Sequence, residues 1–188
     1  AWAERRRGWA GRTGRGIACR LWSEPETQTL GRCWAPEILA ADLTNLVLDL
    51  AVWGVNDPAS LAWLDRPPAA ALSEARNLLL ALGAISEDGR ITERGKRLAR
   101  FPLHPRLAAM VAAAGDDALL AAEIAAVISE RGLGGDDPDL SHRVEQLRRD
   151  KSKRAEEARR LARNWAEESG GKVQNSNVSK AGVLLALA

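Results

Sequence analysis

The sequence has no tyrosine, one phenylalanine and two cysteines among 188 residues, and aromatic residues make up 4% of it. Strands favour aromatic and β-branched side chains, so this scarcity argues against a β-sandwich or a β-barrel. The cysteines, Cys19 and Cys33, are too few for a disulfide framework and too far apart for a CxxC metal or redox pair. We therefore expect a reduced, cytoplasmic protein.

Long apolar runs are also absent. No run reaches the roughly 18 residues that a membrane span needs. The opening residues 1–7 are charged and lack the apolar stretch of a signal peptide. We therefore expect no membrane partner. The chain is instead rich in alanine, with 34 residues. Because alanine is the strongest helix former, the predicted fold class is mainly α, in one or two domains.

Basic residues gather at two places, although the net charge is only +2. Residues 1–20 hold six arginines and one acid, and residues 143–163 hold nine lysines and arginines against four acids. Two basic segments of this kind fit a polyanionic partner such as nucleic acid. A solvated helix face is the alternative explanation for the second segment.

The N-terminal segment is not typical of a complete domain. Residues 6–16 are rich in arginine and glycine and predict a loop, and the alternating apolar residues of 17–22 predict one strand. A single strand is not stable in water, and the later sequence offers no sheet for it to join. We therefore expect residues 1–22 to be the last part of an α/β domain whose other parts lie outside this chain.

The middle of the chain predicts a winged-helix module over 36–101. After a polar linker at 23–35, apolar residues at helical spacing predict one helix from Pro36 to Trp53 and another over 69–82. The pair Asp88-Gly89 between two isoleucines predicts a β-hairpin, with a plain loop as the alternative. Thr92 then caps a further helix.

From residue 102 the pattern is helical throughout. Helices are predicted over 105–114 and 117–130, and a basic helical segment over 139–168, whose polar gap at 151–154 leaves one or two helices open. His104 fits a packing or capping role. We expect a helical bundle over 102–168, followed at 169–188 by a polar linker and the truncated start of a further segment.

No complete active site is present in the sequence. It has no GxxxxGK[ST] phosphate loop, no HExxH and no GxSxG motif. The arginines near the N-terminus are the exception, since an arginine fork suits phosphate oxygens and can stabilise charge on a transferring phosphoryl group.

At this point the residues resemble a known family. The stretch 4–14, ERRRGWAGRTG, resembles the QRxGRxGRTG element of DEAH-box helicases, and 16–23, GIACRLWS, is similar to the strand that follows it there. Further similar stretches follow in the family's order: PEIL at 36–39, WGV at 53–55, DRPP at 65–68, LGA at 82–84, ITERG at 91–95 and LHPRL at 103–107. Over about residues 3–165 the chain resembles the C-terminal part of an HrpB-like DEAH-box ATP-dependent RNA helicase.

The resemblance implies a role for the N-terminal element. Residues 1–35 would be the end of the second RecA-like domain and a linker. Arg12 would be the arginine finger, and the family's ATP-contacting positions fall on Arg6, Gly8, Gly11 and Arg12. ATP with Mg would be bound mainly by the missing N-terminal helicase core. The match departs at Arg5, where the family has Gln, and at Trp9, where the family has a second Arg. Tryptophan cannot supply the cation that binds phosphate at that position.

The resemblance also implies a nucleic-acid surface. The winged helix would keep the domains in register, and the bundle would hold single-stranded RNA or another nucleic acid. The expected contacts from the second basic segment are Arg143, Arg148, Arg149, Lys151, Lys153 and Arg159. The chain is thus expected to be a C-terminal fragment of an RNA helicase, an enzyme by family but inactive alone because it lacks a phosphate loop.

Two other functions fit parts of the sequence. One is a stand-alone winged-helix nucleic-acid-binding regulatory protein, which would read base edges with the helix at 69–82. That helix has Arg76 as its one base. The other is a helical scaffold that binds proteins, which would leave Arg12 without a purpose.

Overall fold

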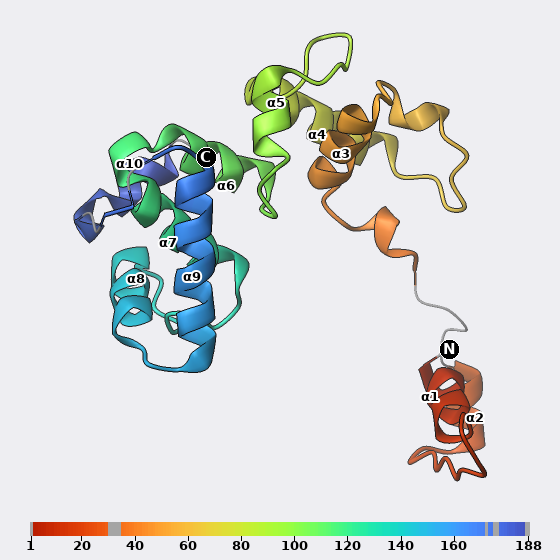
Figure 1. Cartoon of the computed structure of the whole chain (residues 1–188). Coiled ribbons are helices and arrows are strands. Elements are labelled where there is room, and N and C mark those ends of the chain that lie inside the picture. The colour runs from red at the N-terminus through yellow and green to blue at the C-terminus, as the bar shows by residue number, and fades with distance from the viewer. Residues whose placement is uncertain (1, 30–34, 172, 175–176, 187–188) are drawn as a thin grey trace. The chain divides into compact units, whose positions relative to one another are not determined.

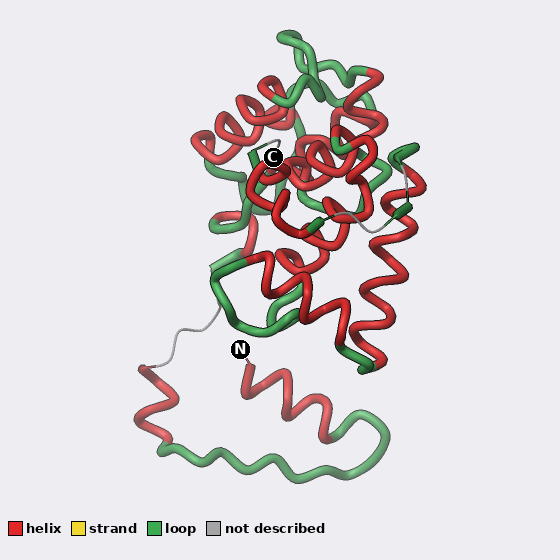
Figure 2. The backbone as a smooth tube through the Cα atoms, turned by 90° about the vertical axis from the view of Figure 1, so that its left-hand side faces the viewer, coloured by secondary structure: helices red, strands yellow, loops and turns green. Residues whose placement is uncertain are grey.

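The computed structural model describes residues 2–29, 35–171, 173–174 and 177–186 (Figure 1). The chain forms two compact units, 1–41 and 42–188, which are described separately below. Figure 2 shows helices and loops, and no strand, in the described parts of the chain. The mainly α fold class is therefore confirmed.

The first unit begins with helix α1 (Trp2–Ala10), where the sequence predicted a loop from residue 6. Side chains three and four residues apart pair along it, as helices favour. Glu4 and Arg7 form an ion pair of 2.7 Å, and the Arg5 guanidinium lies 5.3 Å from the centre of the Trp9 ring. These local pairs compensate for Gly8, so the predicted loop is wrong over 6–10.

The predicted strand at 17–22 is also wrong. Residues 15–20 have no regular secondary structure, and Ile17 and Leu21 are 90% and 94% exposed. A single strand is not stable in water because its backbone groups need a neighbouring strand to pair with. Within the described residues no second strand supplies those partners.

Part of the linker expected at 23–35 is helical. Helix α2 (Glu24–Thr29) begins with a capping box, in which the Glu26 amide donates to Ser23 Oγ at 3.4 Å and the Ser23 amide donates to Glu26 Oε2 at 2.6 Å. The hydrogen bond from the Ser23 backbone lowers the pKa of Glu26. The remainder of the expected linker, at 30–34, lies outside the described residues. A short 3-10 helix, η1 (Glu37–Leu39), follows.

The second unit begins with the segment in which the sequence predicts a winged-helix module, and we call this segment the winged-helix part. It contains α3 (Thr44–Trp53), the 3-10 helix η2 (Pro58–Ser60), α4 (Ala69–Ala81) and α5 (Glu93–Leu98). The single helix expected over 36–53 is interrupted after η1, because Asp42 Oδ1 accepts from the Thr44 amide at 2.7 Å and starts α3 afresh. Gly54, with φ of +94°, ends α3 directly after Trp53, the last residue of the predicted helix.

The buried face of α3 packs against α4. Leu43, Val47, Leu50 and Ala51 are all at most 7% exposed, which is the i, i+4, i+7, i+8 spacing of one helix face. Trp53, the last apolar residue of the predicted helix, does not belong to this face and is 77% exposed. The last buried residue of the face is Ala51.

The expected β-hairpin is wrong as a two-stranded element. Ile85 and Ile91 form one isolated antiparallel bridge around a turn in which Gly89 has φ of +80°. The chain is too short for strands here, because only Leu82, Gly83 and Ala84 separate α4 from Ile85 and α5 begins two residues after Ile91. Thr92 Oγ1 already caps α5 by accepting from the Gly95 amide at 3.0 Å.

The helical bundle surrounds a central buried helix. It consists of α6 (Pro105–Ala113), the 3-10 helix η3 (Gly115–Asp117), α7 (Ala118–Ser129), α8 (Leu140–Arg149) and α9 (Lys153–Glu168). Figure 1 shows α9 lying alongside α7, which is buried over residues 118–127. The side of α9 that is buried carries only alanines, at 155, 158, 162 and 166. Small side chains allow the two helix axes to approach closely.

The sequence left one or two helices open for the basic segment. It forms two, α8 and α9, because Ser152 Oγ accepts from the Ala155 amide at 3.3 Å and caps α9. His104 is a capping residue, since its Nδ1 accepts from the Arg106 amide at 3.3 Å. Gly83, with φ of +65°, follows α4.

Part of the segment expected as a linker at 169–188 packs on the bundle. The 3-10 helix η4 (Val178–Lys180) contacts α8, and α10 (Ala181–Leu185) contacts α7. Val178, Ala181 and Leu184 are at most 8% exposed. None of the helices in the described ranges is long and apolar enough to cross a membrane.

Candidate functional site

The N-terminal arginine element lies on and just after α1. Arg6 and Gly8 are inside the helix, and Gly11 and Arg12 follow it in a turn where the Arg12 amide donates to Trp9 O at 3.3 Å. Both arginine side chains are exposed. A Cβ added to Gly8 would meet nothing within 4 Å, so local packing does not require glycine there.

The two positions that depart from the family pattern contact each other. Arg5 lies over the ring of Trp9, which is 56% exposed. A cation held over an aromatic face keeps its charge while its orientation is restricted. The element thus presents arginine charge in Arg6 and Arg12 and directs Arg5 onto Trp9.

In the second basic segment, Arg148 is bound to a buried acid. Its Nε and Nη2 donate to Glu123 Oε2 at 2.9 and 2.6 Å. Glu123 lies in the middle of α7 and is 3% exposed. A buried carboxylate needs a charged, hydrogen-bonded partner, so Arg148 joins α8 to α7 and neutralises the core acid.

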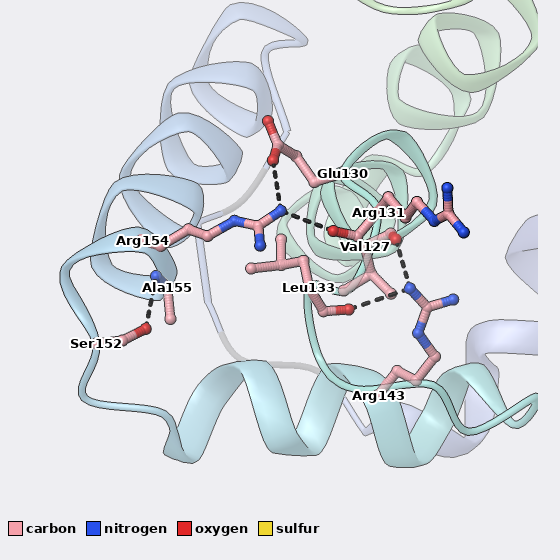
Figure 3. A network of polar contacts seen from close by, with 8 residues as sticks. All are labelled: Val127, Glu130, Arg131, Leu133, Arg143, Ser152, Arg154 and Ala155. Atoms are coloured by element: carbon pink, nitrogen blue, oxygen red, sulfur yellow. Dashed lines mark hydrogen bonds and ion pairs between the residues drawn. The ribbon is translucent and has the colours of Figure 1, made fainter. Parts of the chain in front are cut away.

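Arg143 binds the end of α7 (Figure 3). Its Nη2 donates to Val127 O at 2.8 Å and to Leu133 O at 3.1 Å. The last carbonyls of a helix have no partner within the helix, and a cationic donor there is favourable. Arg143 Nε is buried without a hydrogen-bond partner, which confirms how deeply this side chain is inserted.

Arg154 and Arg159 bind further carbonyls at helix ends. Figure 3 shows Arg154 Nη2 donating to Arg131 O at 2.7 Å and to Glu130 Oε2 at 3.0 Å. Arg159 Nη1 donates to Leu147 O and to Asp150 O, at the end of α8. These arginines connect α7, α8 and α9 to one another.

The remaining basic side chains point to solvent. Arg149 is 81% exposed and pairs with Glu145 on the same helix at 3.0 Å. Four others are exposed on the connection between α8 and α9 and along α9: Lys151, Lys153, Arg160 and Arg163. Of the six nucleic-acid contacts expected from sequence, the structure therefore gives Arg143, Arg148 and Arg159 internal partners and leaves Arg149, Lys151 and Lys153 at the surface. We call Arg149, Lys151, Lys153 and Arg160 the basic surface.

Sequence reasoning missed the internal partner of the basic segment, Glu123. Its signal was present: one acid stands within the apolar run ALLAAEIAAVIS of 118–129. An acid so placed on a buried helix requires a cation from elsewhere in the fold. In the described part of the chain no cluster of histidine, cysteine and acid side chains could hold a metal ion.

Comparison with known proteins defines the class. The family model for the helicase associated domain (HA2), winged-helix, matches residues 75–103, which run from α4 through the turn and α5. These residues are therefore assigned to a helicase-associated winged-helix domain, and the helices α6 to α9 follow them in the chain.

Relatives narrow the class to one branch. ATP-dependent RNA helicase HrpB of Escherichia coli (strain K12) is 41% identical over 127 residues, which are 66% of this chain and 16% of that helicase. Two crystal structures of E. coli HrpB, one titled as a DExH-box NTPase and one as a DEAH/RHA helicase, superpose with TM-scores of 0.72 and 0.75 at 31% and 33% identity. Each covers 98% of this chain, which spans 22% and 23% of theirs.

The chain belongs with the HrpB-like DEAH/RHA helicases, as the region that contains their helicase-associated winged helix. The resemblance predicted from the sequence is confirmed. Because the chain spans about a sixth of the curated relative, activity, substrates and partners of a whole helicase are matters of proposal.

Proposed function

We propose that this chain is the accessory region of an ATP-dependent RNA helicase, where it holds a single strand of RNA and contributes Arg12 to the ATP site. ATP and Mg would be held mainly by a helicase core, because the sequence here has no phosphate loop. We expect no ATP hydrolysis by the chain alone.

The nucleic-acid part of the proposal is supported by the presence of two groups of basic residues, one with internal partners and one exposed to solvent. Four arginines are engaged in holding the bundle, whereas the basic surface gathers exposed charge at the α8–α9 connection and on α9. Lysine and arginine at a surface bind backbone phosphates without reading sequence, as a translocating enzyme requires. The acids nearest in sequence are partly engaged, since Glu145 pairs with Arg149 and Asp150 accepts from the Ser152 amide at 2.8 Å.

The exposed arginines of the first unit support the ATP part. Arg12 is exposed in the turn after α1, and Arg6 is exposed on it. A guanidinium reaching a nucleotide held by another domain stabilises the charge of the transferring phosphoryl group. Trp9 cannot supply such a charge, so Arg12 and Arg6 remain as the phosphate contacts that the element offers.

A stand-alone DNA-reading regulator is less well supported. That function needs basic side chains on α4 to enter a groove. Arg76, the one base of α4, donates to the backbone carbonyl of Glu87 and so holds the turn between α4 and α5.

Binding of labelled single-stranded RNA tests the proposal. We expect the double variant Lys151→Gln/Lys153→Gln to bind several-fold more weakly than the unsubstituted chain, because two phosphate contacts are lost. The matched control, Arg66→Gln/Arg90→Gln, removes the same charge from exposed positions of the winged-helix part and should bind normally. Equal binding by all three proteins, or no binding by any, would refute the proposed RNA contact.

A further inference from the structure

A small cavity lies between the winged-helix part and the bundle, within the second unit. It has a volume of about 160 Å³ and is bordered by α5, α6 and the C-terminal end of α9. One water needs roughly 10–15 Å³ by such a measure, so the cavity admits a group the size of a phosphate. None of its lining residues belongs to the basic surface.

Three arginines line this cavity. Arg94 and Arg97 are three residues apart on α5 and so lie on one face of it, and Arg100 follows just after the helix. Arg100 pairs with Glu168 of α9 at 3.2 Å. In the described structure no hydrogen bond engages the guanidinium of Arg94 or Arg97, and both side chains are exposed. This contrasts with the arginines that hold the bundle.

The inner wall of the cavity is apolar. Leu98 and Phe101 line it and are 1% and 6% exposed. The acids nearby are Glu168, which is paired with Arg100, and Glu93, whose charge interacts with those of Lys96 and Arg97. Two exposed arginine forks beside an apolar wall can both form charge-assisted hydrogen bonds to one phosphate group.

We propose that Arg94 and Arg97 form a second phosphate-binding site for the same RNA strand. This inference rests on the proposed function and adds to it a contact on the winged-helix part. α9 has 16 residues and extends from Lys153 of the basic surface to Glu168 at the cavity. At about 1.5 Å per residue the two sites lie roughly 22 Å apart along this helix. A stacked single strand with the spacing of one duplex strand, about 3.4 Å per nucleotide, spans that distance with about seven nucleotides.

The experiment compares four forms of the full 188-residue chain: the unsubstituted protein, the Lys151→Gln/Lys153→Gln variant, a test variant and a control. The test variant is Arg94→Gln/Arg97→Gln. The control is Lys96→Gln, which removes a charge from the same helix but from a residue outside the cavity, paired with Glu93 at 2.7 Å. Affinity for a labelled single-stranded RNA of about 12 nucleotides is measured between about 50 and 200 mM salt. Circular dichroism confirms that each variant is folded.

We expect the test variant to bind about ten-fold more weakly and the slope of log affinity against log salt to become shallower by about 1.4, since two single-strand contacts are lost. Unchanged affinity and slope in the test variant, with weaker binding by Lys151→Gln/Lys153→Gln, would overturn this site and leave the proposed function standing. An equal loss in Lys96→Gln would also overturn it, because the effect would then be one of general charge. Absence of RNA binding by the unsubstituted chain would overturn both.

Discussion

Replacing Arg148 by methionine should destabilise the second unit strongly without removing an RNA contact. The substitution keeps most of the aliphatic part of the side chain but removes the guanidinium, so the Glu123 carboxylate, which is 3% exposed, loses its two hydrogen bonds. Breaking a buried ion pair on one side costs about 3–5 kcal/mol. At about 2–4 °C per kcal/mol for a chain of this size, the melting temperature should fall by about 10 °C.

The double variant Arg148→Met/Glu123→Leu separates the loss of the pair from the loss of the buried charge. Replacing both partners by apolar residues is often neutral, so most of the lost stability should return. Urea unfolding followed by circular dichroism measures the free energy of unfolding of each protein. Below its melting temperature, Arg148→Met should bind RNA within about two-fold of the unsubstituted chain. Normal stability combined with lost RNA binding would refute the structural role of Arg148.

Three further predictions concern separate parts of the chain. Gly89→Ala should lower the free energy of unfolding by more than about 1 kcal/mol, because φ is +80° and the new Cβ would lie 2.5 Å from a backbone oxygen. The control Gly170→Ala, with φ of +74° and no atom within 4 Å of the new Cβ, should lose only the part due to backbone conformation. Equal losses in urea unfolding would contradict this. A hydrogen bond to Asp137 raises the pKa of His142 above 6.5. The unsubstituted chain should therefore be more stable than His142→Gln below pH 6.5, and this difference should be lost as the pH rises through the raised pKa. Melting temperatures that differ equally at low and high pH would contradict it. In a longer helicase that contains this chain, Arg12→Ala should lower ATP turnover by about 10³-fold or more while RNA binding persists, and unchanged turnover would refute the finger role.

Features set by neighbouring residues in the chain were predictable from the sequence. The Thr92 cap of α5 and the His104 cap of α6 each depend on residues within about four positions of one another. Capping and glycine rules act at that range, so one sequence is enough to apply them.

Features that depend on distant residues were not predictable in the same way. Arg148 meets Glu123 from 25 positions away, and Arg143 meets Val127 from 16. A basic helix face has the same sequence pattern whether its arginines bind phosphate or bind the ends of other helices. The strand expected at 17–22 also failed for a reason of this kind, because pairing depends on a second strand that the described residues do not contain.

The salt dependence of RNA binding by the unsubstituted chain tests the central claim most directly. If the basic surface and the α5 arginines contact three or more phosphates, log affinity for single-stranded RNA should fall with log salt at a slope of about −2 or steeper, at about 0.7 per contact. An affinity that stays constant as salt is raised, or no measurable binding at low salt, would contradict the account that this region of an HrpB-like helicase holds the RNA backbone.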